Sequence, residues 1–341
     1  MKIGLIGYGG VGKAFVRLLE MQKSVLEKEG LHIEVDYIVD CGGGIYQPGG
    51  IDLPSLIEFT ASQGNLTDFI GGSTSLTVWD MATDSDIDLA VIMTPTNKET
   101  GQPGLAYTGA LLQEGKHVVI SDKGPVMLAY HRLKEMARKS GVQLGIGCTT
   151  GGALPSVNGG IMDMAGAEIT SIEGVLNGTT NFILKYMEEE GCEYEEALKE
   201  AQRCGIAETN PVLDVEGWDT AGKLLILTNV LMGEDKTLAD IKVEGITHLT
   251  AEAVCSAAER GCKYKLVGRT CRTESGLSME VGPREIPANH LLYAVDGKNK
   301  AVRYSSDTLG ELMIMGGASG VIPAAASILR DIVNIHRGYR F

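Results

Sequence analysis

The glycine-rich segment near the start of the chain constrains its fold more than any other feature. An apolar run over residues 2–7 leads into residues 7–12, which read GYGGVG, and apolar residues at helical spacing follow. A G-x-G-x-x-G pattern between a strand and a helix is typical of dinucleotide-binding folds. Because the chain has 45 glycines, the triplet alone is weak evidence, and its place after a predicted strand makes it informative.

Each residue of the motif has a physical reason to be there. Gly7 permits a tight turn, Gly9 lets the backbone approach a pyrophosphate, and Gly12 lets the helix pack on the strand. The start of the helix, at Gly10 and Val11, offers N–H groups and positive potential to the phosphates. We predict that these five residues bind the cofactor; the alternative is a purely structural turn.

Asp40 ends the next predicted strand, residues 33–40. An acid at this place accepts hydrogen bonds from the hydroxyls of the adenosine ribose, although Asp40 lies farther from Gly12 than the usual spacing of about 20 residues. No Arg or Lys follows closely, and a carboxylate repels a 2′-phosphate. We therefore favour NAD over NADP. The alternative is that Asp40 is a turn residue.

Composition and charge exclude several classes of protein. At roughly 100–200 residues per domain, the 341 residues predict two domains, and 44% apolar residues suffice for ordinary cores. Lys and Arg number 30 against 44 Asp and Glu, and the net charge of −14 argues against nucleic-acid partners and a membrane surface. No apolar stretch has the roughly 18–20 residues of a spanning helix. The seven cysteines form no C-x-x-C pair, which indicates reduced thiols in a cytoplasmic protein.

The first half of the chain alternates predicted strands with predicted helices. Helices are expected near residues 53–63, 103–114 and 128–139, and a loop over 41–50. Strands are expected over residues 2–7, 33–40, 88–93, 117–120 and 142–147. Such alternation implies right-handed crossovers and an α/β fold with a Rossmann-type, doubly wound parallel sheet.

After about residue 150 the pattern becomes mixed α+β. An acidic helix is predicted over residues 183–203 and an apolar, buried helix over 218–232. The strands of this half are predicted near residues 169–176, 263–270, 277–281, 291–296 and 300–305, with a hairpin turn joining the last two. A glycine-rich segment then leads to a final helix of about residues 323–336.

Asp219 and Lys223 share one face of the predicted helix 218–232, because they are spaced i, i+4. The simpler interpretation is an exposed ion pair worth about 0.3–0.5 kcal/mol. However, the apolar run that follows indicates burial, and the helix dipole disfavours a cation near the start of a helix. Both effects suit a lysine that gives up a proton, with Asp219 fixing its orientation.

Two further residues are candidates for chemistry. Lys123 follows a predicted strand at its carboxyl end, where doubly wound sheets bind ligands, but a plain loop lysine fits equally well. Cys148 is a candidate thiol nucleophile of the kind that semialdehyde dehydrogenases use. No histidine stands near it in the sequence, which disfavours this role.

Five segments together resemble the homoserine dehydrogenase family over nearly the full length of the chain. They are residues 7–12, 121–125 (SDKGP), 151–155 (GGALP), 174–184 (GVLNGTTNFIL) and 205–223, of which the last two are highly specific. The resemblance implies a Rossmann domain, a dimerisation region and an α+β catalytic domain. It also implies a homodimer that interconverts L-homoserine and L-aspartate 4-semialdehyde with NAD or NADP, in threonine and methionine biosynthesis.

The resemblance implies roles for individual residues as well. Lys223, beside Asp219, is the expected proton donor to the carbonyl during reduction, and Lys123 is expected beside the nicotinamide and the reacting oxygen. The expected substrate-binding residues are Glu208 and Asp219, which hold the ammonium group of the amino acid, together with Asp214 nearby. Further cofactor contacts are expected at Thr94, Lys123, Gly205 and Gly317.

The chain departs from the family pattern at two places that bear on the site. Asp122 stands before the loop lysine where the family usually has Asn, and residues 316–320 read GGASG instead of GPGAG or GAGAG. These departures motivate an alternative function, a related NAD(P)-dependent dehydrogenase of another amino or hydroxy acid. A second alternative is an NAD-binding regulatory protein without catalysis, against which the intact residues Glu208, Asp219 and Lys223 argue.

Some members of the family bind sodium through backbone carbonyls and one Glu. The matching carbonyls here are those of Thr150, Gly152 and Leu154, but Gly147 occupies the position of the Glu, so we expect no metal. The chain ends without the regulatory ACT domain of longer members, and feedback by that route is not expected.

The expected organisation is therefore a dinucleotide-binding domain and a second domain for catalysis and dimerisation. We place the first over residues 1–147 and the second over 148–312, and expect residues 313–341 to return to the Rossmann domain.

Overall fold

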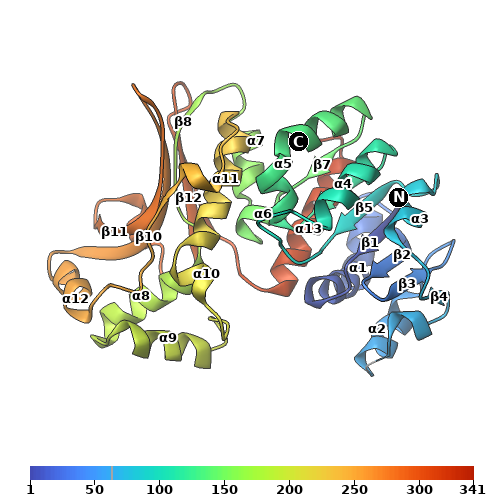
Figure 1. Cartoon of the computed structure of the whole chain (residues 1–341), viewed down its shortest axis with the longest axis horizontal. Helices are drawn as coiled ribbons and strands as arrows, with labels where there is room; N and C mark the ends of the chain where they lie inside the picture. Colours follow the sequence, from blue (N-terminus) through green and yellow to red (C-terminus); the bar gives the residue numbers. More distant parts are fainter. Residues whose placement is uncertain (63) are drawn as a thin grey trace. The chain divides into compact units, whose positions relative to one another are not determined.

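The computed structural model describes residues 1–62 and 64–341, and the chain divides into two units (Figure 1). Unit 1 comprises residues 1–149 and 320–341, and unit 2 comprises residues 150–319. The last helix, α13 (Val321–His336), therefore belongs to the first unit, where it packs against α1 (Gly10–Lys28). The short helix α6 (Cys148–Gly151) spans the boundary in sequence.

Unit 1 is built on a seven-stranded sheet with the order β4-β3-β2-β1-β5-β6-β7. From β2 to β7 all neighbours are parallel, as in a Rossmann fold. These strands are β1 (Lys2–Ile6), β2 (Glu34–Asp40), β5 (Leu89–Ile92), β6 (His117–Ile120) and β7 (Leu144–Gly145). Besides α1 and α13, the helices are α2 (Leu53–Ala61), α3 (Val78–Thr83), α4 (Gly104–Gln113) and α5 (Lys123–Lys139), with the 3₁₀ turn η1 (Leu66–Asp68). All four residues of β5 are buried, because helices cover both faces of such a sheet.

The prediction of a loop over residues 41–50 is wrong. This segment contains β3 (Gly43–Tyr46), which pairs antiparallel with β2, and β4 (Gly72–Ser73) extends the same edge. A Cβ atom at Gly44 would overlap the carbonyl oxygen of Ile38, so glycine is what allows β3 to approach β2. The glycines of this segment permit close strand packing, which sequence reasoning took for turn chemistry.

Unit 2 contains a six-stranded sheet with the order β13-β12-β8-β10-β11-β9, antiparallel except where β11 meets β9. The strands are β8 (Ile169–Val175), β9 (Lys242–Val243), β10 (Cys262–Thr273), β11 (Gly276–Pro287), β12 (Lys300–Ser306) and β13 (Glu311–Gly316). The helices are α7 (Ser156–Asp163), α8 (Gly178–Glu190), α9 (Tyr194–Arg203), α10 (Val212–Val215), α11 (Trp218–Met232) and α12 (Ala251–Glu259). Two 3₁₀ turns are η2 (Leu238–Asp240) and η3 (Leu291–Ala294). The apolar helix α11 packs across β8 and β10, as its composition predicts (Figure 1).

Two predictions for unit 2 are wrong for identifiable reasons. The acidic segment 183–203 is not one helix, because Gly191 adopts φ 62° and ends α8 before α9 begins. Residues 291–296 do not form a strand. Instead, Leu292 and Val295 enter a hydrophobic cluster with residues of β8, β10 and β12, and an apolar run of this length looks the same in sequence as a strand.

A buried lysine anchors the loop that replaces this strand. Lys265 is only 1% exposed, and its Nζ donates hydrogen bonds to the Val295 carbonyl, to Asn181 Oδ1 and to Asp296 Oδ1 at 2.6, 2.9 and 3.0 Å. Burial lowers the pKa of Lys265, and the Asp296 carboxylate opposes that shift. The buried ammonium is tolerated because its donors are matched by acceptors.

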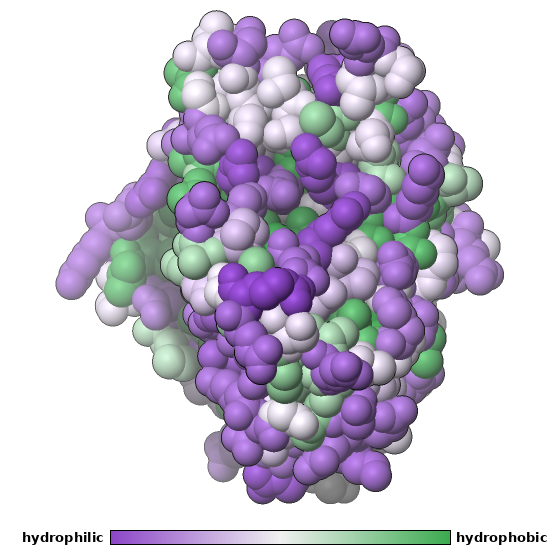
Figure 2. Space-filling model, turned by 90° about the vertical axis from the view of Figure 1, so that its left-hand side faces the viewer, coloured by the Kyte–Doolittle hydropathy of each residue, from purple (hydrophilic) through white to green (hydrophobic). Residues whose placement is uncertain are grey.

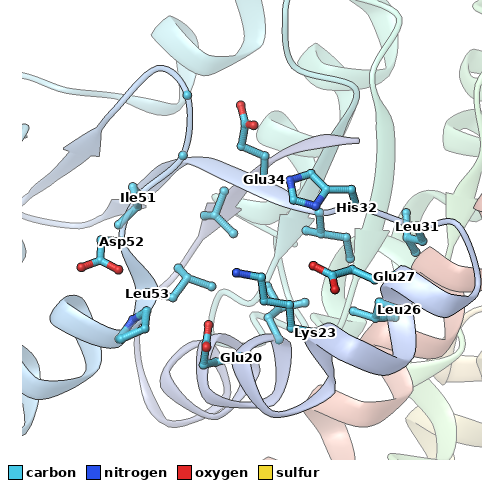
Figure 3. Close-up of a pocket in the computed structure, with 16 residues that line it drawn as sticks. Glu20, Lys23, Leu26, Glu27, Leu31, His32, Glu34, Ile51, Asp52 and Leu53 are labelled. Carbon is cyan, nitrogen blue, oxygen red and sulfur yellow. The ribbon is translucent and has the colours of Figure 1, made fainter.

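A cavity of about 250 Å³ opens in unit 1 between α1 and residues 49–54 (Figure 3). Glu20, Lys23 and Glu27 of α1 line it together with His32 and Asp52. It lies where β2 begins, at the opposite end of that strand from Asp40. Because dinucleotides bind at the carboxyl ends of the strands, this cavity is not the predicted cofactor site.

None of the helices in residues 1–62 and 64–341 has the length and apolar character needed to cross a membrane. The seven cysteines are all free thiols.

Candidate active site

The glycine-rich loop of unit 1 has the geometry that a bound pyrophosphate requires. Gly7 adopts φ 94°, and a Cβ at Gly12 would overlap the Gly7 carbonyl oxygen, so both positions need glycine for the fold itself. Gly9 differs, because a Cβ there would meet no atom within 4 Å. The open space beside Gly9 is the cradle that the pyrophosphate of a dinucleotide can enter.

The start of α1 completes this cradle. Gly9 is the residue before α1, and no side chain caps the helix. The first turn of α1, which begins with Gly10 and Val11, contains no acidic residue. The positive end of the helix dipole is therefore left for an anionic group. These features fit the dinucleotide that the motif predicts.

Asp40 lies at the end of β2, directly beside this loop. One carboxylate oxygen accepts a hydrogen bond from the Tyr8 N–H at 2.9 Å, and the other accepts one from the Cys41 N–H at 2.8 Å. The side chain is exposed. An exposed carboxylate fixed at this end of β2 suits a ribose diol and repels a 2′-phosphate.

Thr94 and Lys123 stand at the carboxyl ends of the two following strands. A Cβ at Gly7 would lie 2.7 Å from the Met93 carbonyl oxygen, so the segment that carries Thr94 adjoins the glycine loop. Lys123 is the first residue of α5, and its backbone N–H donates to Thr96 Oγ1 at 3.3 Å. The structure thus gathers the glycine loop, Asp40, Thr94 and Lys123 at one edge of the sheet.

Asp122 is a helix cap. Its Oδ1 accepts a hydrogen bond from the Gly124 N–H at 2.9 Å, and its Oδ2 accepts one from Thr94 Oγ1 at 3.0 Å. The residue is 1% exposed, and burial raises the pKa of its carboxyl, opposed by these hydrogen bonds and by the Lys123 charge. An Asn side chain could cap α5 in the same way. The departure from the family's Asn therefore preserves the local structure.

The second group of candidate residues lies in unit 2, where β8, α10 and α11 meet. Lys223 Nζ lies 2.5 Å from Asp219 Oδ2 and donates a hydrogen bond to the Leu176 carbonyl oxygen at 2.8 Å. Both side chains of the ion pair are 14% exposed. The pair is thus neither the solvated helical pair of the simpler interpretation nor fully buried, and it remains accessible to a small molecule.

Asn177 connects this ion pair to a second acid, Asp214. Its Nδ2 donates hydrogen bonds to Asp214 Oδ1 at 2.6 Å and to Asp219 Oδ2 at 2.9 Å. The sequence analysis gave Asn177 no role. The available signal was an asparagine between a predicted strand and a helix, which is a preferred helix cap.

Glu208 and Gly205 lie in the loop between α9 and α10. Gly205 adopts φ 65° where α9 ends, and Glu208 is exposed. Within the described residues, the Glu208 carboxylate does not join the Lys223 cluster, and its backbone carbonyl accepts a hydrogen bond from Gln202. The roles of Glu208 in substrate binding and Gly205 in cofactor binding stay predictions.

Gly317 packs tightly against the turn that carries the candidate cation ligands. A Cβ at Gly317 would overlap the backbone of Leu154, and Gly152 adopts φ 59° in the same turn. Lys300, 4% exposed, donates a hydrogen bond from Nζ to the Gly151 carbonyl oxygen at 2.7 Å. A metal ion at the carbonyls of Thr150, Gly152 and Leu154 would share this turn with a buried ammonium. The donor set therefore suits a cation poorly.

Cys148 lacks the exposure of a reactive nucleophile. It is buried, and its Sγ lies 3.5 Å from the Ala324 carbonyl oxygen. Reactive thiols are partly exposed and activated by a neighbouring base or positive charge at an accessible position. The thiol-nucleophile alternative is disfavoured.

Comparisons with known proteins point to one family. A family model described as homoserine dehydrogenase matches residues 155–333. A homoserine dehydrogenase of Methanocaldococcus jannaschii is 38% identical, over 98% of this chain and 98% of that protein. An NAD(+)-dependent homoserine dehydrogenase of Pseudomonas canavaninivorans is 32% identical, over 98% of this chain and 96% of that protein. A crystal structure from Archaeoglobus fulgidus, described as that of a "putative homoserine dehydrogenase", has a TM-score of 0.87 and 33% identity, covering 98% of this chain and 99% of that one.

The glycine loop yields a paired test. Gly9→Ala should leave the melting temperature unchanged, because a Cβ there is unobstructed, and should weaken NAD binding about tenfold or more by filling the cradle. Gly12→Ala should lose about 1–3 kcal/mol of stability, because its Cβ overlaps the Gly7 carbonyl. Thermal unfolding and calorimetric titration with NAD measure the two effects. Unchanged NAD affinity in a folded Gly9→Ala protein would contradict the cradle.

Proposed function

Because the chain belongs to the homoserine dehydrogenase family, we propose that it interconverts L-homoserine and L-aspartate 4-semialdehyde with NAD or NADP. The observation that carries the proposal is the Lys223 ammonium, fixed by Asp219 Oδ2 and the Leu176 carbonyl oxygen. A positioned ammonium can stabilise and protonate an oxygen on which negative charge develops. The reaction would serve threonine and methionine biosynthesis.

The residues divide the work as follows. The nicotinamide, when bound, supplies the hydride chemistry. Lys223 gives a proton to the carbonyl oxygen in the reductive direction and accepts the hydroxyl proton in the oxidative direction. Lys123, at the start of α5, adds positive charge beside the nicotinamide and the reacting oxygen. Asp214, Asp219 and Glu208 bind the substrate ammonium.

The cofactor site favours NAD. Asp40 carries a negative charge at the end of β2, where the adenosine ribose is expected, and the Pseudomonas canavaninivorans relative is named as NAD(+)-dependent. The glycine loop and the start of α1 bind the pyrophosphate. Thr94, Gly205 and Gly317 are the further cofactor contacts of this proposal.

We also infer that the protein works in the cytoplasm as a homodimer, with unit 2 supplying the interface. On the face of its sheet that carries Glu173, the residues Ser171, Cys271 and Ser305 stand in register on three adjacent strands and are partly buried. Glu173 pairs with Arg303 at 3.2 Å on this face. The side of the molecule that lies at the left in Figure 1 is largely hydrophilic with scattered apolar groups (Figure 2). Such a mixed, partly buried strand surface can match a second copy of itself across a two-fold axis.

Removing the Lys223 amine tests the catalytic assignment. Lys223→Ala should lower turnover of homoserine by about 10²–10⁴-fold, the scale of general acid–base catalysis, with cofactor affinity little changed. Lys199→Ala, at an exposed lysine of α9, is the matched control and should keep full activity. Absorbance at 340 nm with L-homoserine and each nucleotide measures turnover, and circular dichroism checks the fold. A parallel loss of cofactor binding would give Lys223 a structural role instead. Turnover of another amino or hydroxy acid but not of homoserine would support the alternative dehydrogenase.

The ribose assignment is tested by the preference between cofactors. Asp40→Ala should weaken NAD more than NADP, because it removes the ribose acceptor and the charge that repels a 2′-phosphate. Cys41→Ala, at the next exposed residue, should change neither affinity. Equal losses for NAD and NADP would refute the assignment. Titration of cofactor fluorescence gives both dissociation constants.

Sedimentation equilibrium tests the dimer. The expected mass is twice the chain mass of 36.3 kDa. Ser171→Arg should shift the protein toward the monomer, because it places a long charged side chain on the proposed interface face, whereas Lys199→Glu on α9 should not. A monomer at micromolar concentration would contradict the inference.

A further inference from the structure

Asn177 holds two acids and a helix at once. It precedes α8 as its N-cap, and its Oδ1 accepts hydrogen bonds from the Thr180 N–H at 2.9 Å and from Thr180 Oγ1 at 3.2 Å. Because the oxygen is committed to Thr180, the Nδ2 group must point the other way. It faces Asp214 and Asp219 and donates to both.

The amide links the two carboxylates without adding a charge of its own. Asp219 Oδ2 accepts one hydrogen bond from Asn177 Nδ2 and another from Lys223 Nζ. Asp219 lies on the same helix as Lys223, Asp214 comes from α10, and the segment after β8 contributes the Leu176 carbonyl that accepts from Lys223. A neutral double donor links the two carboxylates at a fixed separation, while the Lys223 ammonium pairs with Asp219.

The choice of residue supports a role beyond capping. Ser and Asp cap helices as well as Asn does. Asp at position 177 would set a third carboxylate against Asp214 and Asp219, and Ser would be too short to reach them. Among good caps, Asn supplies both the acceptor for α8 and the donors for the acids. Its 5% exposure shows that these bonds form away from bulk water, where an unmet polar group is costly.

We propose that Asn177 is a positioning residue, which fixes Asp214 and Asp219 around Lys223 and thereby orients the lysine for proton transfer. The inference rests on the proposed function, because it assigns Lys223 to that chemistry. Asn177 acts through the two acids and touches no reacting atom in this account. Its loss should therefore lower kcat and weaken homoserine binding while leaving the affinity for NAD unchanged.

Two variants separate capping from positioning. Asn177→Ser retains an acceptor for the Thr180 N–H but removes the donors. It should stay folded with a lowered melting temperature, as Thr250→Ala does, while kcat/KM for homoserine falls about tenfold, the scale of a lost hydrogen bond to a charged group. Asn177→Asp retains the cap and nearly the shape of the side chain but adds a negative charge. Its kcat/KM for homoserine should fall about 100-fold or more. Thr250→Ala is the matched control. It removes the side-chain cap of α12 in the same unit, and should lower stability without changing kinetics.

The pH profile of kcat supplies a readout that a merely structural role would not move. If Asn177 positions the acids, Asn177→Ser and Asn177→Asp displace the midpoints of the pH profile of kcat, and they do so to different extents because only the second adds a charge. A uniform loss at every pH, with wild-type midpoints, would overturn the proposal. Wild-type kcat and KM in folded Asn177→Ser would overturn it as well. Failure of the unmodified protein to oxidise homoserine would instead refute the proposed function, and the two failures are thereby distinguished.

Discussion

The contact on which the functional account depends is the one between Lys223 and Asp219. An ammonium in a half-enclosed site is stable only if acceptors replace the water it loses. Here the acceptors come from two directions, a carboxylate one turn earlier on the same helix and a backbone carbonyl at the end of β8. The lysine is therefore tied to the end of a strand as well as to its own helix, and its position follows the packing of α11 on the sheet of unit 2.

Unit 1 also uses acidic side chains to fix the edge of its sheet where the ligand is expected. The carboxylate of Asp40 organises the glycine loop through the Tyr8 N–H, and the buried Asp122 caps the helix that begins with Lys123. In both places an acid at the end of a strand fixes the backbone from which a candidate binding group extends. The fold therefore prepares this edge before any ligand arrives, which limits the ordering that binding must impose.

The strongest sequence signals came from residues whose role is local. The G-x-G-x-x-G triplet predicted the loop between the first strand and the first helix. The apolar run over residues 218–232 predicted α11 with the correct bounds. The failures came from residues whose role depends on distant partners. The sequence around Gly44 predicts a turn, whereas in the structure Gly44 lies against Ile38 of the neighbouring strand. The sequence around Leu292 predicts a strand, whereas Leu292 packs in a hydrophobic cluster. Asn177 was overlooked for the same reason, since the acids that it binds lie far along the chain.

The return of α13 to the first unit has a consequence for how the chain is made. Unit 2 is an insertion within unit 1, because residues 320–341 complete the unit that residues 1–149 begin. The apolar side of α1 has no cover from α13 until the C-terminus has left the ribosome. Residues 150–319 can therefore fold during synthesis before residues 320–341 complete unit 1.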